Sequence, residues 1–310
     1  MRRDSVVTLL TLGYALHGCG RLDEARRAWQ SVLRLDPSNA EAKQRLNVPA
    51  TTSPSPVPIS GATGSADQAF SLCKTALRTD KGSVDVMFAA RGPVDEAIVR
   101  DVCERDIYRL VEVKTAPATI LDVGAHIGCF SALAAHRWPN ARIVACEPDL
   151  ANYVLLDRHL KPCLTRGQIE VVNKAVLGDD VSETDFWAVA DKAHQNSGGG
   201  SCCRQEPGSA RVRTQAISIE QLWREQGLTT CDLLKLDCEG AEYSILEGLK
   251  KAQLLPHVGR IVGEWHCGFG RMSSPQDAEA ELQRILSPTH RLSVELKEGS
   301  HEGHFVAERL

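Results

Sequence analysis

Short apolar runs alternate with amphipathic stretches over most of the chain after residue 90. Continuous apolar runs are typical of buried strands, and a repeat of three to four residues is typical of helices that cover a sheet. This alternation predicts an α/β domain with a doubly wound, mostly parallel sheet. Strands are expected at 119–123, 142–147, 169–173, 212–215, 232–237 and 260–266, and helices at 94–113, 128–138, 149–160, 218–226, 242–250 and 275–286. Two further alternating runs, 291–297 and 304–309, predict a C-terminal antiparallel hairpin that places one antiparallel strand at the edge of the sheet.

A different pattern precedes this domain. Residues 5–46 predict a small α-helical hairpin in which Leu12, Gly13, Leu16, Gly20, Ala25, Trp29, Val32 and Pro37 fall at the offsets of a tetratricopeptide repeat. A single repeat cannot bury a core, since about three stacked copies are needed. The hairpin is therefore either an ordinary structural element or a module that binds a protein partner. Residues 48–67 are rich in Pro, Ser, Thr and Gly and predict a linker, which gives a hairpin at 1–47, the linker at 48–67 and the α/β domain at 68–310.

Charge and composition limit the partners. The net charge of −4 gives no support to nucleic acid or an anionic membrane as a partner. No apolar run approaches the ~20 residues that span a bilayer. Residues 1–19 have the outline of a signal peptide, but Asp4 and His17 argue against one, and the helical hairpin explains the same residues. The 11 cysteines show no zinc spacing and lie mostly in apolar runs, so reduced thiols in the cytoplasm are expected.

A glycine-containing loop follows the first predicted strand of the sheet and carries the candidate cofactor site. Asp122 ends this strand, and Gly124, Ala125, His126 and Gly128 lead into the next helix. Ligands of doubly wound sheets lie at the carboxyl ends of the strands. The loop lacks the three-glycine spacing of a pyrophosphate site, and Asp122 suits the cationic amino-acid end of S-adenosylmethionine better than a phosphate.

The next strand ends in Glu147, where a carboxylate accepts hydrogen bonds from the two ribose hydroxyls of a nucleoside. Together, the loop and Glu147 predict a site for S-adenosylmethionine.

Acidic residues and a histidine end the next two strands. Lys235 and Asp237 share one face of a strand and are expected to form a pair that orders the strand end, because a buried charge needs a partner. Asp237 and Glu239, with Glu264 and His266 on the following strand, are the candidate catalytic residues. They can supply a general base that takes a hydroxyl proton or, alternatively, hold a divalent cation. The base is favoured, since a sequence does not show the several ligands that a metal requires.

These motifs in this order resemble the FkbM-type methyltransferases over about residues 85–270. The matching runs are 120–128, Glu147-Pro148, 234–242 and 262–266, with a weaker match at 173–179. The resemblance implies a Rossmann-like methyltransferase sheet, S-adenosylmethionine as methyl donor, and O-methylation of sugars, glycolipids or related small molecules. It also implies that the segment containing Ala175 lies beside the adenine. His126 departs from the family pattern, which usually has Asn there, and the N-terminal hairpin is not part of that pattern.

The expected function is thus S-adenosylmethionine-dependent O-methylation of a small molecule or glycan. Two alternatives stay open: an NAD-dependent oxidoreductase on the same architecture, and a non-catalytic adaptor that binds through residues 5–46. The second alternative predicts loss of the cofactor carboxylates, yet Asp122 and Glu147 are both present.

Overall fold

Two units make up the chain, Met1–Ala69 and Phe70–Leu310. The structure, a computed structural model, describes residues 22–37, 39, 42–43, 46, 71–79, 82–164, 168–190, 196–205, 208–270, 272–296 and 300–310. In the first unit, helix α2 (Leu22–Leu35) buries Trp29 and Val32 and exposes Arg27 and Arg34, as an amphipathic helix should. The first helix of the predicted hairpin and the linker at 48–67 lie outside the described residues. The repeat-like hairpin and its partner therefore stay predictions.

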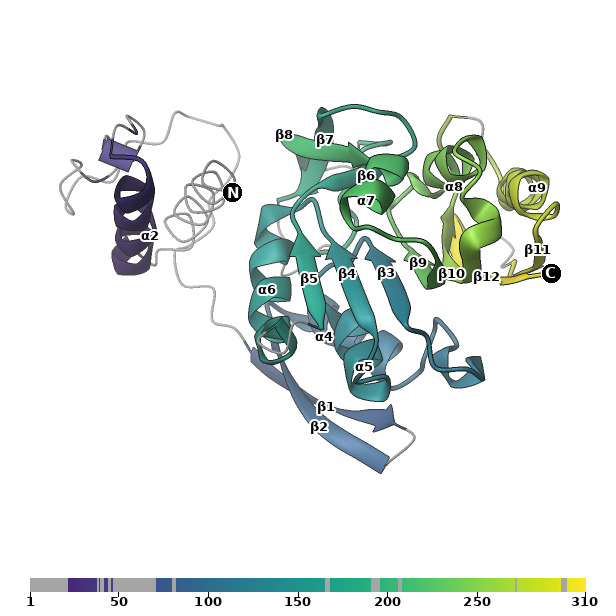
Figure 1. The fold of residues 1–310 in the computed structure, drawn as a ribbon, viewed down its shortest axis with the longest axis horizontal. Helices are drawn as coiled ribbons and strands as arrows, with labels where there is room; N and C mark the ends of the chain where they lie inside the picture. The colour runs from purple at the N-terminus through teal and green to yellow at the C-terminus, as the bar shows by residue number, and fades with distance from the viewer. Residues whose placement is uncertain are drawn as a thin grey trace. The chain divides into compact units, whose positions relative to one another are not determined.

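A seven-stranded, mostly parallel sheet forms the centre of the second unit (Figure 1). Its order is β11-β12-β10-β9-β3-β4-β5. The strands are β3 (Thr119–Val123), β4 (Arg142–Cys146), β5 (Ile169–Val172), β9 (Cys231–Leu236), β10 (Val258–His266), β11 (His290–Val294) and β12 (Glu302–Arg309). The predicted doubly wound sheet is confirmed, with a switch point where the chain passes from β3 to β4 on one side and returns to β9 on the other.

The C-terminal hairpin of β11 and β12 is also present, but its place in the sheet differs from the expectation. β12 pairs antiparallel with both β10 and β11 and lies between them, so the antiparallel strand is one position in from the edge. β12 therefore pairs directly with β10, and β11 forms the edge of the sheet. The sequence pattern shows the hairpin but not which of its strands pairs with the rest of the sheet.

Helices cover both faces of the sheet and bury two apolar clusters. On one face lie α4 (Pro93–Cys103), α5 (Cys129–Arg137) and α6 (Leu150–Leu164), and on the other α7 (Ile219–Glu225), α8 (Glu242–Lys251) and α9 (Pro275–Leu286). The side chains of β3 alternate between the faces: Ile120 packs in the first cluster, and Leu121 and Val123 in the second. This burial on both sides explains the continuous apolar runs.

The helix predicted at 94–113 is shorter than expected. α4 ends at Cys103, and a short 3-10 turn follows at Leu110–Glu112. Asp106 between them has φ 54°, a left-handed conformation that cannot continue an α-helix. Its carboxylate accepts the N–H groups of Leu110 and Val111, both at 2.8 Å. An Asp that caps the next turn therefore ends the helix.

Among the described residues, two smaller sheets accompany the central one, and four of their five strands were not predicted. β1 (Ser71–Thr79) and β2 (Gly82–Ala90) form an antiparallel hairpin, while β6 (Ala175–Leu177), β8 (Ser209–Ser218) and β7 (Glu183–Val189) form a three-stranded sheet. Only β8 was anticipated, as a short strand. β7 lies in a segment for which no strand was predicted. The first four residues of β2 and most of the first half of β8 are exposed, so neither strand has a buried apolar run along its whole length.

Within the described ranges, none of the helices is long and apolar enough to cross a membrane. The cysteines whose side chains the structure describes are free thiols: Cys73, Cys103, Cys129, Cys146, Cys202, Cys203, Cys231, Cys238 and Cys267.

Candidate active site

The loop that joins β3 to α5 connects the ends of three strands. The N–H groups of Gly124 and Ala125 both donate to the carbonyl oxygen of Cys146 at the end of β4, at 3.0 and 2.9 Å. Gly124 has φ 77°, and a Cβ there would lie 1.8 Å from the carbonyl oxygen of Asp237, which follows β9. Only glycine permits so close an approach.

Gly128 closes the same loop and begins α5. Its φ of 93° is again left-handed, and a Cβ would lie 2.9 Å from Leu156 of α6. Gly128 lies at the turn where it was predicted, but it packs against α6 and does not line the cavity described below.

Glu147 follows β4 directly and fixes the loop with its carboxylate. Its Oε2 accepts the His126 N–H at 2.8 Å, and its Oε1 accepts the Asp149 N–H at 2.9 Å. The side chain is 5% exposed. Two charge-assisted hydrogen bonds from backbone groups hold such a carboxylate in one orientation.

The His126 side chain joins a buried polar network at the far side of the loop. Its Nε2 lies 3.0 Å from Ser197 Oγ and 3.7 Å from Asp95 Oδ1. Ser197 Oγ donates to Asp95 at 2.6 Å, and Arg91 forms a salt bridge with Asp95 at 2.8 Å. His126, where the family pattern has Asn, thus connects the cofactor loop with α4 and the segment at 196–201.

Asp122 lies behind the loop rather than in the cavity. It is fully buried, accepts a hydrogen bond from Ser131 Oγ at 2.6 Å, and lies 3.4 Å from Lys235 Nζ. Burial raises the pKa of Asp122, against the opposing effect of the Lys235 ammonium. Lys235 also donates to the carbonyl oxygen of Gly124. This geometry does not fit the expectation that Asp122 contacts the cationic end of a ligand directly, because a neighbouring strand already supplies its cation.

Asp237 lies where β9 ends and faces the cavity. Its Oδ2 accepts a hydrogen bond from the Tyr108 hydroxyl at 2.6 Å and lies 3.7 Å from Lys235 Nζ, so the expected Lys235–Asp237 pair is present. Burial acts to raise the pKa of Asp237, but Lys235, His266, His304 and the hydrogen bond from Tyr108 together outweigh it, and the pKa is lowered. The ring of Tyr108 packs edge-on against Phe130 at 5.5 Å between centroids, which holds its hydroxyl in place.

Glu239 occupies a tight turn after β9 and is surrounded by polar groups. Its φ is 51°, a conformation that costs energy for a residue other than glycine. Arg204 Nη2 lies 2.5 Å from Oε2, Asn196 Nδ2 donates to Oε1 at 3.4 Å, and Ser201 Oγ donates to the backbone carbonyl at 2.7 Å. Burial raises the pKa of Glu239 to about 7.

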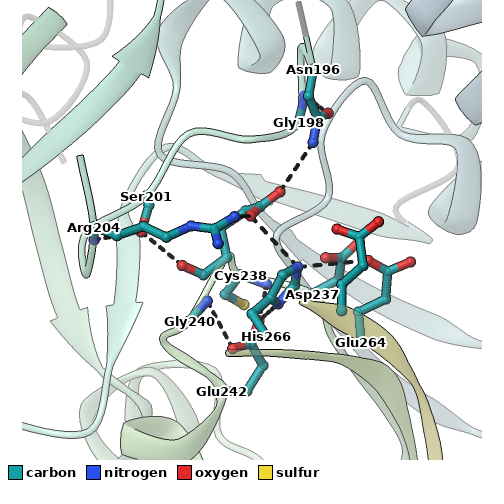
Figure 2. A network of polar contacts seen from close by, with 12 residues as sticks. Asn196, Gly198, Ser201, Arg204, Asp237, Cys238, Gly240, Glu242, Glu264 and His266 are labelled. Carbon is teal, nitrogen blue, oxygen red and sulfur yellow. Dashed lines mark hydrogen bonds and ion pairs between the residues drawn. The ribbon is translucent and has the colours of Figure 1, made fainter. Parts of the chain in front are cut away.

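His266 ends β10 and lies among three glutamates (Figure 2). Its Nδ1 is 3.1 Å from Glu242 Oε1, and its Nε2 is 3.6 Å from Glu239 Oε2 and 3.7 Å from Glu264 Oε2. Glu264 Oε1 in turn lies 3.0 Å from His304 Nε2, because Glu264 and His304 are register partners across β10 and β12. The ring of His266 is fully buried and does not line the cavity.

One cavity of about 270 Å³ connects the loop with the carboxylates. Among the predicted residues, eight line it: Gly124, Ala125, His126, Glu147, Ala175, Asp237, Glu239 and Glu264. Asp122, Gly128 and His266 lie in the layer behind them. The side chains predicted from four separate strand ends therefore converge on one space.

Sequence reasoning missed several polar residues of this site. Tyr108 and Arg204 contact Asp237 and Glu239 from segments 129 and 35 residues away in the chain. No local motif marks either residue. Glu242 carries a signal, since it lies in the same acidic run as Asp237 and Glu239, and helix α8 begins with it.

The similarity to known proteins falls in the same part of the chain. The model of the methyltransferase FkbM domain matches residues 122–283. Over 225 residues the chain is 31% identical to the AMB antimetabolite synthetase AmbE of Pseudomonas aeruginosa, covering 61% of this chain and 10% of that protein. It is 24% identical over 186 residues to the methyltransferase sdnD of Sordaria araneosa, covering 49% of this chain and 68% of that protein.

Solved structures of methyltransferases are also among the proteins to which the chain is similar. A methyltransferase FkbM from Methylobacillus flagellatus matches with a TM-score of 0.44 and 16% identity, covering 65% of this chain and 46% of that one. An S-adenosylmethionine-dependent O-methyltransferase from Thermotoga maritima matches with a TM-score of 0.40 and 13% identity, covering 76% of this chain and 77% of that one. The chain spans a tenth of the length of AmbE and less than half of the M. flagellatus protein. The family model covers more than half of the sequence and includes the cofactor loop and both strand ends, so the chain belongs to the FkbM methyltransferase family.

Proposed function

We propose that this chain transfers a methyl group from S-adenosylmethionine to a hydroxyl group of a small molecule, sugar or glycolipid. The observation that carries the proposal is the single cavity, lined by Gly124 and Glu147 on one side and by Asp237, Glu239 and Glu264 on the other. A cofactor loop and candidate proton acceptors in one space are what methyl transfer to an alcohol requires.

The chemistry of the lining fits the proposed cofactor. Oε2 of Glu147 accepts the His126 N–H, and Oε1 accepts the Asp149 N–H and a longer hydrogen bond from Asn152 Nδ2. A carboxylate oxygen can accept more than one hydrogen bond, and a ribose hydroxyl is the donor proposed here. Val176 and Phe186 add apolar surface beside Ala175, which suits the adenine ring. When bound, the cofactor supplies a methyl group on a sulfonium, whose C–S bond breaks with its electron pair as the acceptor oxygen takes the methyl group.

The charges behind the loop take a supporting role in this proposal. Lys235 connects Asp122, Asp237 and the carbonyl oxygen of Gly124, so that it holds the loop at a fixed distance from β9. Asp122 therefore acts through Lys235 on the shape of the loop. This replaces a direct contact between Asp122 and the cofactor.

Asp237 is the residue proposed to accept the hydroxyl proton. An alcohol is a poor nucleophile until its proton is removed, and a positioned carboxylate contributes to that step. Asp237 lines the cavity, and the Tyr108 hydroxyl fixes its orientation. Glu239 also lines the cavity, but Arg204 and Asn196 already engage its two carboxylate oxygens.

Calorimetry of the full chain with S-adenosylmethionine, S-adenosylhomocysteine and NAD tests the cofactor. We expect the first two to bind and NAD not to bind. Preference for NAD would favour an oxidoreductase, and binding of none of the three would favour an adaptor. A screen of hydroxylated acceptors with a labelled methyl donor then identifies the substrate class.

Asp237→Asn tests the proton acceptor. We expect cofactor affinity to stay within about threefold while turnover falls by about 10² or more, the usual contribution of a general base. Asp232→Asn is the matched control, since Asp232 lies at the opposite end of β9 and accepts the N–H groups of Ala118 and Thr119. Turnover of Asp237→Asn equal to that of the control would assign the proton to Glu264 instead, which also lines the cavity.

A further inference from the structure

A fully buried histidine nitrogen points into the carboxylate cluster without a hydrogen-bond partner. His266 is 0% exposed, and its Nε2 has no hydrogen-bond partner among the described residues. The nearest acceptors are Oε2 of Glu239 and Oε2 of Glu264, at 3.6 and 3.7 Å. A buried polar atom without a partner is costly, so its retention at this point requires a reason.

The other ring nitrogen of His266 is firmly fixed. Nδ1 lies 3.1 Å from Glu242 Oε1, and Glu242, itself 0% exposed, accepts the N–H groups of Cys238 and Gly240 at 2.6 and 2.9 Å. A carboxylate so held accepts a hydrogen bond from Nδ1 and fixes the ring with Nε2 directed toward Glu239 and Glu264. Figure 2 shows the ring between Glu242 and Glu264. Histidines that bind metal ions are oriented in the same way, by a carboxylate on the second nitrogen.

The spacing of the surrounding oxygens suits a single ion. The ligand atoms of Glu264, His266 and Glu302 all lie within 4.8 Å of one another. Donor atoms 2.0–2.2 Å from one ion lie at most about 4.2 Å from each other, so the 3.7 Å between Nε2 of His266 and Oε2 of Glu264 is compatible with a shared ion. Glu302 of β12 is exposed and adds the third ligand atom.

The charge at this place also favours a cation. Four carboxylates, those of Asp237, Glu239, Glu242 and Glu264, surround the ring of His266. Among the described residues, two cations besides the histidines form salt bridges with these carboxylates, Arg204 and Lys235. Lys235 is also shared with Asp122. With a neutral imidazole, the cluster retains an excess of negative charge, which a divalent ion balances.

We propose that Nε2 of His266 and the carboxylate of Glu264, with Glu302 from β12, bind one divalent transition-metal ion such as Mn²⁺, Fe²⁺ or Zn²⁺. The nitrogen ligand selects against Mg²⁺ and Ca²⁺, which prefer oxygen. Glu264 and Glu302 line the cavity, so the ion lies at its edge, where it can bind the acceptor hydroxyl and lower the pKa of that group. This second role rests on the proposed function, whereas metal binding itself does not.

Metal binding is measured on the full chain after treatment with a chelator. Dialysis against Mn²⁺, Zn²⁺ or Mg²⁺ separately, followed by elemental analysis, should give about one equivalent of Mn²⁺ or Zn²⁺ and none of Mg²⁺. Calorimetric titration should then show at least tenfold weaker binding in His266→Gln and in Glu264→Gln. Glu242→Gln should lose about 10–100-fold, as expected for a residue that orients a ligand.

His290→Gln is the matched control, because His290 is 1% exposed in the same sheet and its Nε2 lies 3.1 Å from the carbonyl oxygen of Val258. Its metal affinity should equal that of the unsubstituted chain. If His266→Gln does not fold, as judged by circular dichroism, Glu264→Gln decides the result. No stoichiometric binding of any of these ions, or equal binding in the variants, would overturn the proposal and leave a protonated His266 bridging the carboxylates. Cofactor binding to the metal-free chain is measured separately, so a chain that binds metal but not S-adenosylmethionine contradicts the proposed function alone.

Discussion

Lys235 is the centre of a buried charge network, and its removal should unfold the domain more easily. Its side chain is 3% exposed and contacts Asp122, which is 0% exposed, at 3.4 Å. Lys235→Met fits the space but leaves the Asp122 carboxylate without a cation. Breaking a buried pair from one side typically costs about 3–5 kcal/mol in the free energy of unfolding. In a domain of this size, that corresponds to a fall in melting temperature of about 6–20 °C.

Urea unfolding followed by circular dichroism measures this cost. Lys74→Met is the control, because Lys74 and Asp85 form a pair at 2.6 Å whose side chains are 62% and 60% exposed. Such a surface pair contributes at most about 1 kcal/mol. The double variant Asp122→Asn with Lys235→Met should recover part of the loss, since no buried charge is then left unpaired. A cost for Lys235→Met no larger than that of Lys74→Met, or no recovery in the double variant, would refute the reasoning.

Two further predictions concern the cofactor loop and the helix beside it. Gly124→Ala should weaken S-adenosylmethionine binding at least tenfold by calorimetry, because the added Cβ would lie 1.8 Å from the Asp237 carbonyl oxygen. Gly227→Ala is the control, since Gly227 has φ 59° and no atom lies within 4 Å of the added Cβ. It should cost about 1 kcal/mol of stability and leave the affinity unchanged. His159 accepts the Ala89 N–H at Nε2 and lies 2.7 Å from the Ile127 carbonyl at Nδ1, and burial lowers its pKa. In the unfolded chain His159 has its ordinary pKa of about 6.5, so below that pH the unfolded chain binds more protons than the folded chain. Stability should therefore fall as the pH decreases from 7 to 5, and less so in His159→Gln. An equal slope of stability against pH in both proteins would contradict this.

The local order of motifs was sufficient to predict the sheet and the loop. Continuous apolar runs followed by Gly124 and Glu147 placed two strand ends side by side, because parallel strands bring their carboxyl ends to one edge. For the same reason Asp237 and Glu264 were expected to converge. The structure confirms the strands, and these residues line one cavity.

Contacts between distant segments were beyond the reach of the sequence. Tyr108 reaches Asp237 only because Asp106 ends the preceding helix and the chain turns back toward β9. His304 meets Glu264 because β12 inserts beside β10 rather than at the edge. Such pairings depend on register and packing, which no local pattern encodes.

The sequence by itself determined the class of fold and the place of the site, since both follow from the periodicity of side chains and from the geometry of parallel strands. The tertiary structure decided the roles within that site. Asp122, expected at the ligand, is buried behind the loop because Lys235 of the neighbouring strand is its partner. His266, expected as a base, points its Nε2 at two glutamates because Glu242 fixes the other side of its ring. Burial and partners set the chemistry of a charged group, and only the packed chain supplies them.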